Sequence, residues 1–195
     1  MYIDQTYKLK NGRPQYNYLK CLQYMQQQGI ILYGSSYRIR PSQRQQLYKL
    51  LLYATDNKAQ CISYGIDLKK GLLVTGPENS GKTGLLHLLK PFFQLKQQYL
   101  IRSIREVVFC YQRFGRDTLQ QYIFHDLPYC FDDLGLEQCI LNNEVIKEVL
   151  QFRLSLAANQ THIITRLQKP AIIEMYGNDF STMLYQNLNY IKLTT

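Results

Sequence analysis

Apolar residues along this chain gather into two kinds of segment. Short continuous apolar runs, which predict buried strands, occupy 71–75, about 104–110, 127–131, 162–165 and 189–193. Between these runs the apolar residues recur at helical spacing, over 85–89, about 116–122, 143–158 and 170–176. Strands that alternate with helices through short connections are typical of a parallel sheet whose two faces are both covered by helices. The pattern therefore predicts an α/β fold.

The first forty residues carry a weaker pattern. A partial apolar stripe predicts a helix over 16–28, and a second helix is expected over 43–54. Tyrosines are interleaved with basic residues here, so the segment could pack on the domain, bind a protein partner or stack on single-stranded nucleic acid. No repeat or low-complexity linker separates it from the rest. We expect a helical N-terminal extension, residues 1–40, packed on a core of residues 41–195.

An octet of the form Gly-x-x-x-x-Gly-Lys-Thr directly follows the first predicted strand and opens a predicted helix. In this context the pattern forms a phosphate-binding loop, the Walker A motif. Its glycines let backbone N–H groups close around phosphate, and the helix that follows adds its positive N-terminal end. Lys82 is expected to reach the β- and γ-phosphates, and the Thr83 hydroxyl to bind Mg²⁺. The sequence thus predicts ATP and Mg²⁺ as ligands, with the nucleotide held by Gly76, Pro77, Glu78, Asn79, Ser80, Gly81, Lys82, Thr83 and Gly84.

The apolar run 127–131 ends in two carboxylates, Asp132 and Asp133. A strand that ends in acidic residues, in a chain with a phosphate-binding loop, is the Walker B pattern. Asp132 is expected to bind Mg²⁺ together with Thr83, and Asp133 to polarise the attacking water, so these aspartates are the candidate catalytic residues. Fifty residues separate Lys82 from Asp132, which leaves room for one more strand and helix. We therefore expect a further strand between the two motif-bearing strands, as in the added-strand (ASCE) ATPases that include the AAA+ and RecA-like groups.

These motifs resemble those of the DnaC/IstB-type AAA+ ATPases, which are helicase loaders and transposition helpers and include prophage and mobile-element versions. The segments that carry the resemblance are 71–83, 131–137 and 161–165, and more weakly 176–193. The resemblance implies a P-loop NTPase that binds Mg-ATP and self-associates when ATP is bound. It also implies contacts with a replicative helicase, a transposase subunit or single-stranded DNA, in DNA replication or mobile-element DNA metabolism.

Residues that assist hydrolysis in that family are missing here. The family typically has Thr-Asn after the fourth strand, where this chain has Thr165-Arg166, and it carries arginines where residues 178–183 hold no cation. An arginine finger raises turnover ~10³–10⁵-fold in phosphoryl transfer. We therefore expect a weak ATPase with little or no lid domain. Two alternatives stay open, a non-hydrolysing nucleotide-gated scaffold and a small-molecule kinase, although the Asp-Asp-Leu-Gly string argues against the kinase.

Length and composition indicate the number of domains and the cellular location to expect. A chain of 195 residues, 46 % of them hydrophobic, suits one globular domain. No apolar run approaches the ~20 residues that span a bilayer, and the N-terminus has no signal-peptide core, so we expect a cytoplasmic protein with no membrane partner. The five cysteines form no C-x-x-C pair, which fits a reducing compartment, and Cys110 and Cys130 fall in predicted strands. The net charge of +9 permits nucleic-acid binding without establishing it.

Overall fold

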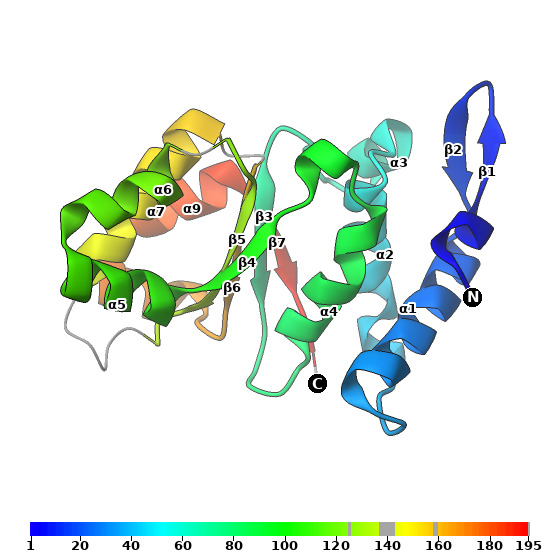
Figure 1. Ribbon diagram of the computed structural model, residues 1–195, viewed down its shortest axis with the longest axis horizontal. Coiled ribbons are helices and arrows are strands. Elements are labelled where there is room, and N and C mark those ends of the chain that lie inside the picture. The colour runs from blue at the N-terminus through cyan, green and yellow to red at the C-terminus, as the bar shows by residue number, and fades with distance from the viewer. Residues whose placement is uncertain (125, 137–142, 158–159, 195) are drawn as a thin grey trace.

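The computed structural model describes residues 1–124, 126–136, 143–157 and 160–194. Its centre is a sheet of five parallel strands in the order β4-β5-β6-β3-β7, with helices on both faces (Figure 1). The strands are β3 (Gly71–Thr75), β4 (Leu100–Ser103), β5 (Tyr129–Leu134), β6 (Thr161–Thr165) and β7 (Leu188–Lys192). This architecture confirms the predicted α/β P-loop fold, including the extra strand. Strand β6 lies between β3, which leads into the phosphate-binding loop, and β5, which carries the two aspartates.

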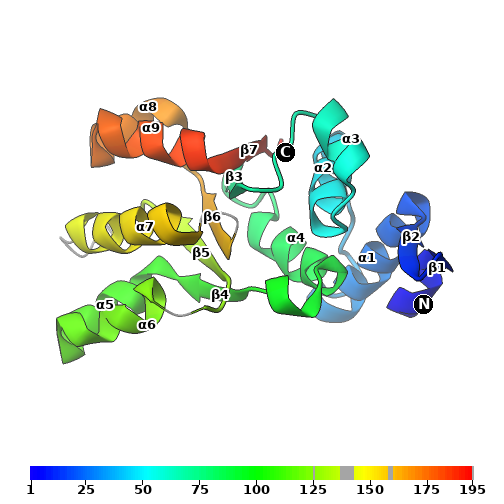
Figure 2. The same ribbon diagram turned by 90° about the horizontal axis from the view of Figure 1, so that it is seen from above.

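Two groups of helices cover the two faces of the sheet, as the view from above shows (Figure 2). One group comprises α1 (Tyr18–Tyr33), α2 (Arg44–Ala54), α3 (Lys58–Ser63) and α4 (Lys82–Leu89). The other group comprises α5 (Ile104–Phe114), α6 (Gln120–Ile123), α7 (Asn143–Ala157), α8 (Lys169–Tyr176) and α9 (Asn178–Asn187). Side chains alternate along β3, so Leu72 and Val74 belong to one hydrophobic core and Leu73 to the other. Because both faces are covered, every residue of β3 is buried.

Helix α1 is longer than its apolar pattern predicts. The expected helix covers 16–28, whereas α1 continues through Gly29 and four residues beyond. A Cβ atom on residue 29 would lie 2.1 Å from the ring of Tyr37, so this glycine lets the following segment fold back closely against the helix. The buried side chains of Cys21 and Met25 attach α1 to a core that it shares with α2 and α4.

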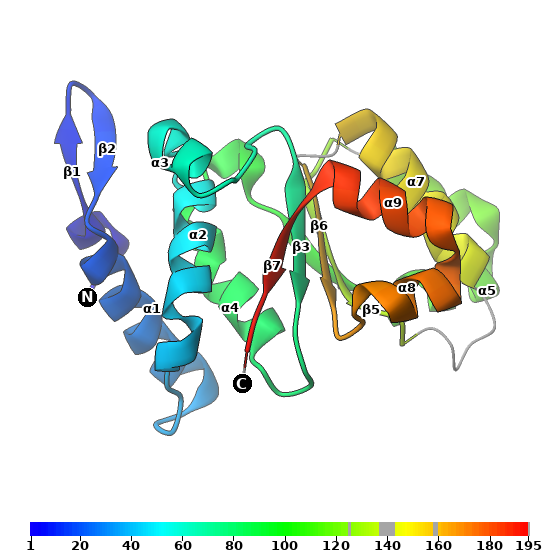
Figure 3. The same cartoon turned by 180° about the vertical axis from the view of Figure 1, so that it is seen from behind.

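A hairpin of β1 (Tyr7–Lys10) and β2 (Arg13–Tyr16) has no counterpart among the predicted elements, and neither do α3 and α9. The sequence signal of the hairpin is the alternation of apolar and basic residues along β1 followed by Asn11-Gly12 at the turn, and not a run of apolar residues, because most of its side chains are exposed. The hairpin stands at one end of the molecule, on the far side of α1 from the central sheet (Figures 1 and 3).

The prediction of a strand over 104–110 is wrong. The strand in this region is β4, which ends at Ser103, and residues 104–110 belong to helix α5. Positions i, i+3 and i+4 form one face of a helix, and the buried residues of α5 have this spacing: Ile104, Val107 and Val108. The apolar run is therefore the inner face of an amphipathic helix, and Cys110 lies on that helix and not in a strand.

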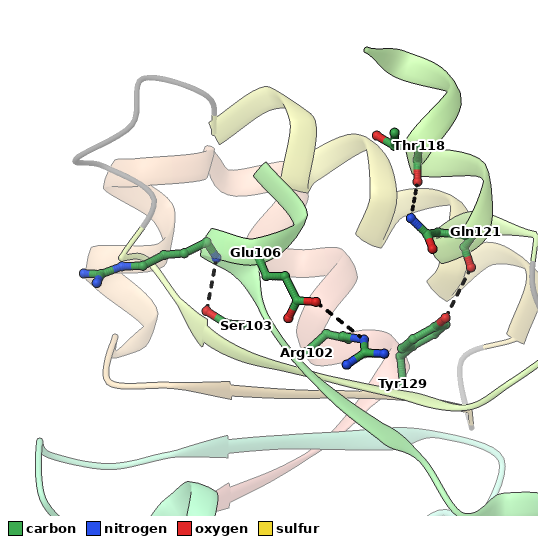
Figure 4. Close-up of polar contacts among 7 residues, drawn as sticks. Arg102, Ser103, Glu106, Thr118, Gln121 and Tyr129 are labelled. Carbon is green, nitrogen blue, oxygen red and sulfur yellow. Dashed lines mark hydrogen bonds and ion pairs between the residues drawn. The ribbon is translucent and has the colours of Figure 1, made fainter. Parts of the chain in front are cut away.

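Polar contacts secure the start of α5 and the neighbouring α6 (Figure 4). The Ser103 hydroxyl oxygen caps α5 by accepting a hydrogen bond from the N–H of Arg105 (3.3 Å). Arg102, near the end of β4, forms an ion pair with Glu106 in the first turn of α5 (4.0 Å). Ser103 is therefore a cap that a strand prediction overlooks, and it marks the point where the chain leaves the sheet.

Other predicted helices are found with small shifts at their ends. The helices expected over 43–54, 143–158 and 170–176 correspond to α2, α7 and α8, and the segment 116–122 forms a 3₁₀ turn followed by α6. The part of the chain that the structure describes contains no separate lid domain. Within the same residues, no helix combines the length and the apolar composition that crossing a bilayer requires.

Candidate functional site

The loop between β3 and α4 contains the predicted phosphate-binding residues. Asn79 and Gly81 adopt left-handed backbone conformations, with φ of 60° and 80°, so the chain curls back on itself before α4 begins. A Cβ atom on residue 76 would lie 2.7 Å from the carbonyl oxygen of Leu193, so only glycine permits this approach to the end of β7. The loop is thus shaped by its own glycines and by the strand beside it.

Lys82 lies inside this loop and is buried. Its Nζ donates hydrogen bonds to the carbonyl oxygens of Gly76 (3.0 Å) and Pro77 (2.8 Å). Burial lowers the pKa of Lys82, while the negative charges of Asp132 and Asp133 act to raise it. The ammonium is therefore held in the loop by carbonyl groups that phosphate oxygens can replace as acceptors.

Thr83 and Asp132 are 49 residues apart in sequence and are in direct contact. The Thr83 hydroxyl donates a hydrogen bond to Oδ2 of Asp132 (2.8 Å), and the N–H of Asp133 donates to Oδ1 of Asp132 (2.9 Å). Burial raises the pKa of the Asp132 carboxyl, and the bond from Thr83 opposes that shift. The structure thus brings together the two side chains that the sequence predicts to share Mg²⁺.

Asp133 is the exposed residue of β5, whose other residues are buried. Its backbone is left-handed (φ 64°), and the pairing of β5 with β6 shifts register between Phe131 and Leu134. The carboxylate consequently reaches a cavity of about 280 Å³ beside the loop. The residues that line this cavity are Glu78, Asn79, Gly81, Lys82, Thr83, Gly84, Asp133, Leu136 and Arg166. Glu137, the last residue of the family string 131–137, lies outside the described residues.

No protein-family model and no curated protein matches this sequence. Among solved structures, the DnaC helicase loader is 17 % identical, and the match covers 82 % of this chain and 94 % of that chain with a TM-score of 0.58. DnaI is 18 % identical, and the match covers 83 % of this chain and 87 % of that chain with a TM-score of 0.56. A replication initiator DnaA bound to AMPPCP and single-stranded DNA is 14 % identical, with 80 % of this chain and 48 % of that chain covered and a TM-score of 0.53. The chain shares the P-loop NTPase α/β fold of these proteins.

Arg166 is a cavity residue that neither Walker motif contains. It follows β6 directly, and β6 lies between the strands that carry the two motifs, so Arg166 lines the cavity together with Lys82. Its Nη1 lies 3.9 Å from Oε2 of Glu78 in an exposed ion pair. The sequence signal that points to it is its position in place of the asparagine in the Thr-Asn pair of the DnaC/IstB-type ATPases.

Gln43 supports the other side of the loop. It is buried at the start of α2, and its Nε2 donates hydrogen bonds to the carbonyl oxygens of Ser80 (2.7 Å) and Thr194 (3.2 Å). A second cavity, of about 310 Å³, opens here and is lined by Ser36, Tyr37, Arg38, Arg40, Gln43, Asn79, Ser80, Gly81 and Leu85. No sequence signal distinguishes Gln43 from the other glutamines of this chain, because its role depends on contacts with the distant loop.

The oxygen donors at the site fit Mg²⁺ bound together with a nucleotide. A threonine hydroxyl and a carboxylate are hard ligands, and Mg²⁺ usually takes one or two carboxylates and completes its shell with water and phosphate. Among the described residues, no cluster of three or more histidine, cysteine or acidic side chains could hold a metal alone. A site with Thr83 and Asp132 as its protein ligands therefore suits a metal that arrives with phosphate.

Proposed function

We propose that this chain binds Mg-ATP and is an accessory ATPase of the DnaC helicase-loader type, acting in DNA replication or mobile-element DNA metabolism. The observation that carries the proposal is the hydrogen bond between Thr83 and Asp132 (2.8 Å) beside the buried Lys82. This bond joins the Walker A residue Thr83 to the Walker B residue Asp132, a contact that a loop serving only to connect β3 and α4 does not require. The fold shared with the DnaC helicase loader and DnaI supports the class of function. In this proposal residues 1–40 are an extension and 41–195 the nucleotide-binding core.

Each site residue has a distinct task in this proposal. The backbone N–H groups of the loop and of the first turn of α4 surround the phosphates, and Lys82 places a positive charge on them. Thr83 and Asp132 hold Mg²⁺, which when bound neutralises charge on the phosphates. Asp133, at the cavity wall, accepts a hydrogen bond from the attacking water and orients it.

Hydrolysis is slow in this proposal because α9 carries no arginine or lysine. Arg166 supplies part of the missing charge from the same chain, at the cavity that also contains Lys82 and Asp133. Its partner Glu78 is exposed, so their ion pair is weak and easily exchanged for phosphate. The absence of cations from α9 also favours the second candidate function, a nucleotide-gated scaffold that binds ATP and does not turn it over.

Calorimetric titration of the full chain with ATP and Mg²⁺ tests the nucleotide site. Lys82→Ala is expected to abolish binding, whereas Lys96→Ala, an exposed lysine outside the cavity, is expected to bind like the wild type. Thr83→Ala is expected to bind ATP with a reduced response to Mg²⁺. Absence of ATP binding by the wild type, or equal binding by Lys82→Ala, would refute the proposal.

Phosphate release separates the weak ATPase from the scaffold. Turnover that Asp133→Asn abolishes would support hydrolysis, whereas ATP binding without turnover would support the scaffold. Arg166→Ala is expected to lower the affinity for ATP more than that for ADP, because only ATP has a γ-phosphate. Equal loss for both nucleotides would contradict a contact between Arg166 and the γ-phosphate.

The proposed partners are a replicative helicase or transposase subunit, further copies of this chain and single-stranded DNA. The DnaA structure supports the DNA partner, because DnaA of the same fold is bound to single-stranded DNA there. On α5, Phe109 and Phe114 are exposed, and the guanidinium of Arg113 lies 5.7 Å from the centre of the Phe114 ring. Exposed aromatics beside cations stack on unpaired bases. Phe109→Ala is expected to weaken binding of a single-stranded oligonucleotide, and sedimentation with and without ATP tests self-association.

A further inference from the structure

The β1–β2 hairpin is a two-stranded antiparallel ribbon with an exposed tip. Asn11 and Gly12 form its turn with φ of 52° and 73°, the left-handed conformations of a two-residue turn that matches the strand twist. The base is attached to the domain, because the Tyr16 ring contacts that of Phe92 (6.1 Å between centres) and the carbonyl of the buried Thr6 accepts a hydrogen bond from the chain after β2. Among the described residues, no third strand pairs with either edge.

The register divides the hairpin into two unlike faces. Residues paired across two strands point to the same face, and the faces alternate along each strand. Tyr7, Leu9, Pro14 and Tyr16 share one face, to which the contact with Phe92 belongs. The opposite face consists of Lys8, Lys10, Arg13 and Gln15, all of them exposed.

The cationic face forms no ion pair within the part of the chain that the structure describes, although Lys10 and Arg13 line a cavity that Asp56 also lines. None of Lys8, Lys10 and Arg13 forms an ion pair among the residues that the structure describes, and the hairpin contains no acidic residue. Lys10 and Arg13 are direct cross-strand neighbours, an arrangement that is destabilising in an isolated hairpin. A polyanion bound to this face would remove the repulsion.

We propose that the cationic face of this hairpin docks into the major groove of duplex DNA. The major groove of B-form DNA is about 12 Å wide and admits a two-stranded ribbon, whereas the major groove of duplex RNA is too narrow. Proteins that bind single-stranded DNA combine cations with aromatic rings on which the bases stack, whereas the tyrosines of the hairpin lie on the face opposite its cations. A protein strand needs a free backbone edge, and Pro14 lacks the N–H that such an edge would donate. The ribbon width, the charge and the placement of the aromatics all favour duplex DNA.

Fluorescence anisotropy of the full chain with a labelled DNA duplex tests the proposal. The test variant is Lys8→Gln with Lys10→Gln and Arg13→Gln; the control replaces three other exposed lysines by glutamine, Lys58, Lys69 and Lys96, and so removes the same net charge. The test variant is expected to bind about tenfold or more weakly, and its slope of log affinity against log salt should fall by about 1 for each phosphate that the hairpin no longer neutralises. The control is expected to stay close to the wild type, as is a charge-conserving variant with Lys8→Arg and Lys10→Arg.

Four outcomes would overturn the proposal. They are absence of duplex binding by the wild type, equal loss in the control, equal or tighter binding of duplex RNA, and an equal effect of the test variant on single-stranded DNA. Retention of ATP affinity and of the thermal unfolding curve by the test variant establishes that the loss of DNA binding is local. Because the three altered side chains lie outside the nucleotide cavity, this result is independent of whether the chain hydrolyses ATP.

Discussion

Replacing His162 by glutamine tests whether the buried imidazole of this residue is neutral in the folded protein. His162 lies in β6, is 1 % exposed, and accepts at Nδ1 a hydrogen bond from the N–H of Leu72 in β3 (3.2 Å). Three aromatic rings surround it, those of Tyr53, Phe93 and Tyr99 at 5.9, 5.8 and 4.9 Å between centres. Burial, reinforced by the charge of Arg153, lowers the pKa of His162 from 6.5 to about 3. The imidazole is therefore neutral in the folded protein.

The effect of pH on stability follows from this shift in the pKa of His162. Between about pH 6.5 and about pH 3 the unfolded chain binds a proton at this residue and the folded protein does not, so acid favours unfolding. Each pH unit in that window changes the free energy of unfolding by about 1.4 kcal/mol. His162 is thus expected to remove about 2 kcal/mol of stability between neutral pH and about pH 5.

Urea unfolding of the wild type and His162→Gln across this pH range measures the effect. Glutamine keeps an oxygen that can accept the bond from Leu72 and has no proton to gain. The other titrating groups are common to both proteins, so their contributions cancel in the difference between the two curves. We expect the wild type to lose about 2 kcal/mol more than the variant on acidification. Parallel curves of unfolding free energy against pH would refute the inference that His162 is buried and neutral.

Three further predictions concern the nucleotide site. Because burial raises the pKa of Asp132, Mg-dependent ATP affinity should begin to fall on acidification above the ordinary aspartate pKa of about 3.9, and Asp132→Asn should lose both the Mg²⁺ and the pH response in calorimetry. Gly76→Ala places a methyl group 2.7 Å from the Leu193 carbonyl, so urea unfolding should show a loss of about 1–3 kcal/mol, and unchanged stability would contradict the close approach. Gln43→Leu removes the donor to the Ser80 carbonyl, so it should cost about 1–3 kcal/mol of stability and weaken ATP binding, whereas equal ATP affinity would show that the loop holds its shape without it.

The fold was predictable where a local pattern has one physical meaning. The glycine spacing of residues 76–83 suits a backbone that wraps an anion, and the continuous apolar run of β3 suits a strand buried on both faces. The pattern of segment 104–110 is ambiguous, because its closely spaced apolar residues suit a strand as well as one face of a helix. Packing against the second core selected the helix. The hairpin was missed although Tyr7 and Leu9 alternate with lysines and Asn11-Gly12 suits a two-residue turn, because the alternation covers only four residues of each short strand.

The candidate site divides in the same way. Lys82, Thr83, Asp132 and Asp133 were predicted from the sequence as site residues, because each stands next to the strand or helix that positions it, and the structure places them close to one another. Arg166 could not be assigned to the cavity from the sequence, because the sequence predicted a strand between the two motif-bearing strands without showing that this strand is β6.

The sequence by itself determined the glycine-rich loop that is predicted to bind phosphate, the acidic strand end and the alternation of strands with helices, because these depend on contacts between near neighbours in the chain. Only the tertiary structure decided which distant groups complete the site. It joined Thr83 to Asp132, placed Arg166 in the cavity and set Gln43 against the carbonyl of Ser80. It also turned three cations to one face of the hairpin. Such arrangements follow from strand order and register, which are selected by the packing of the whole core.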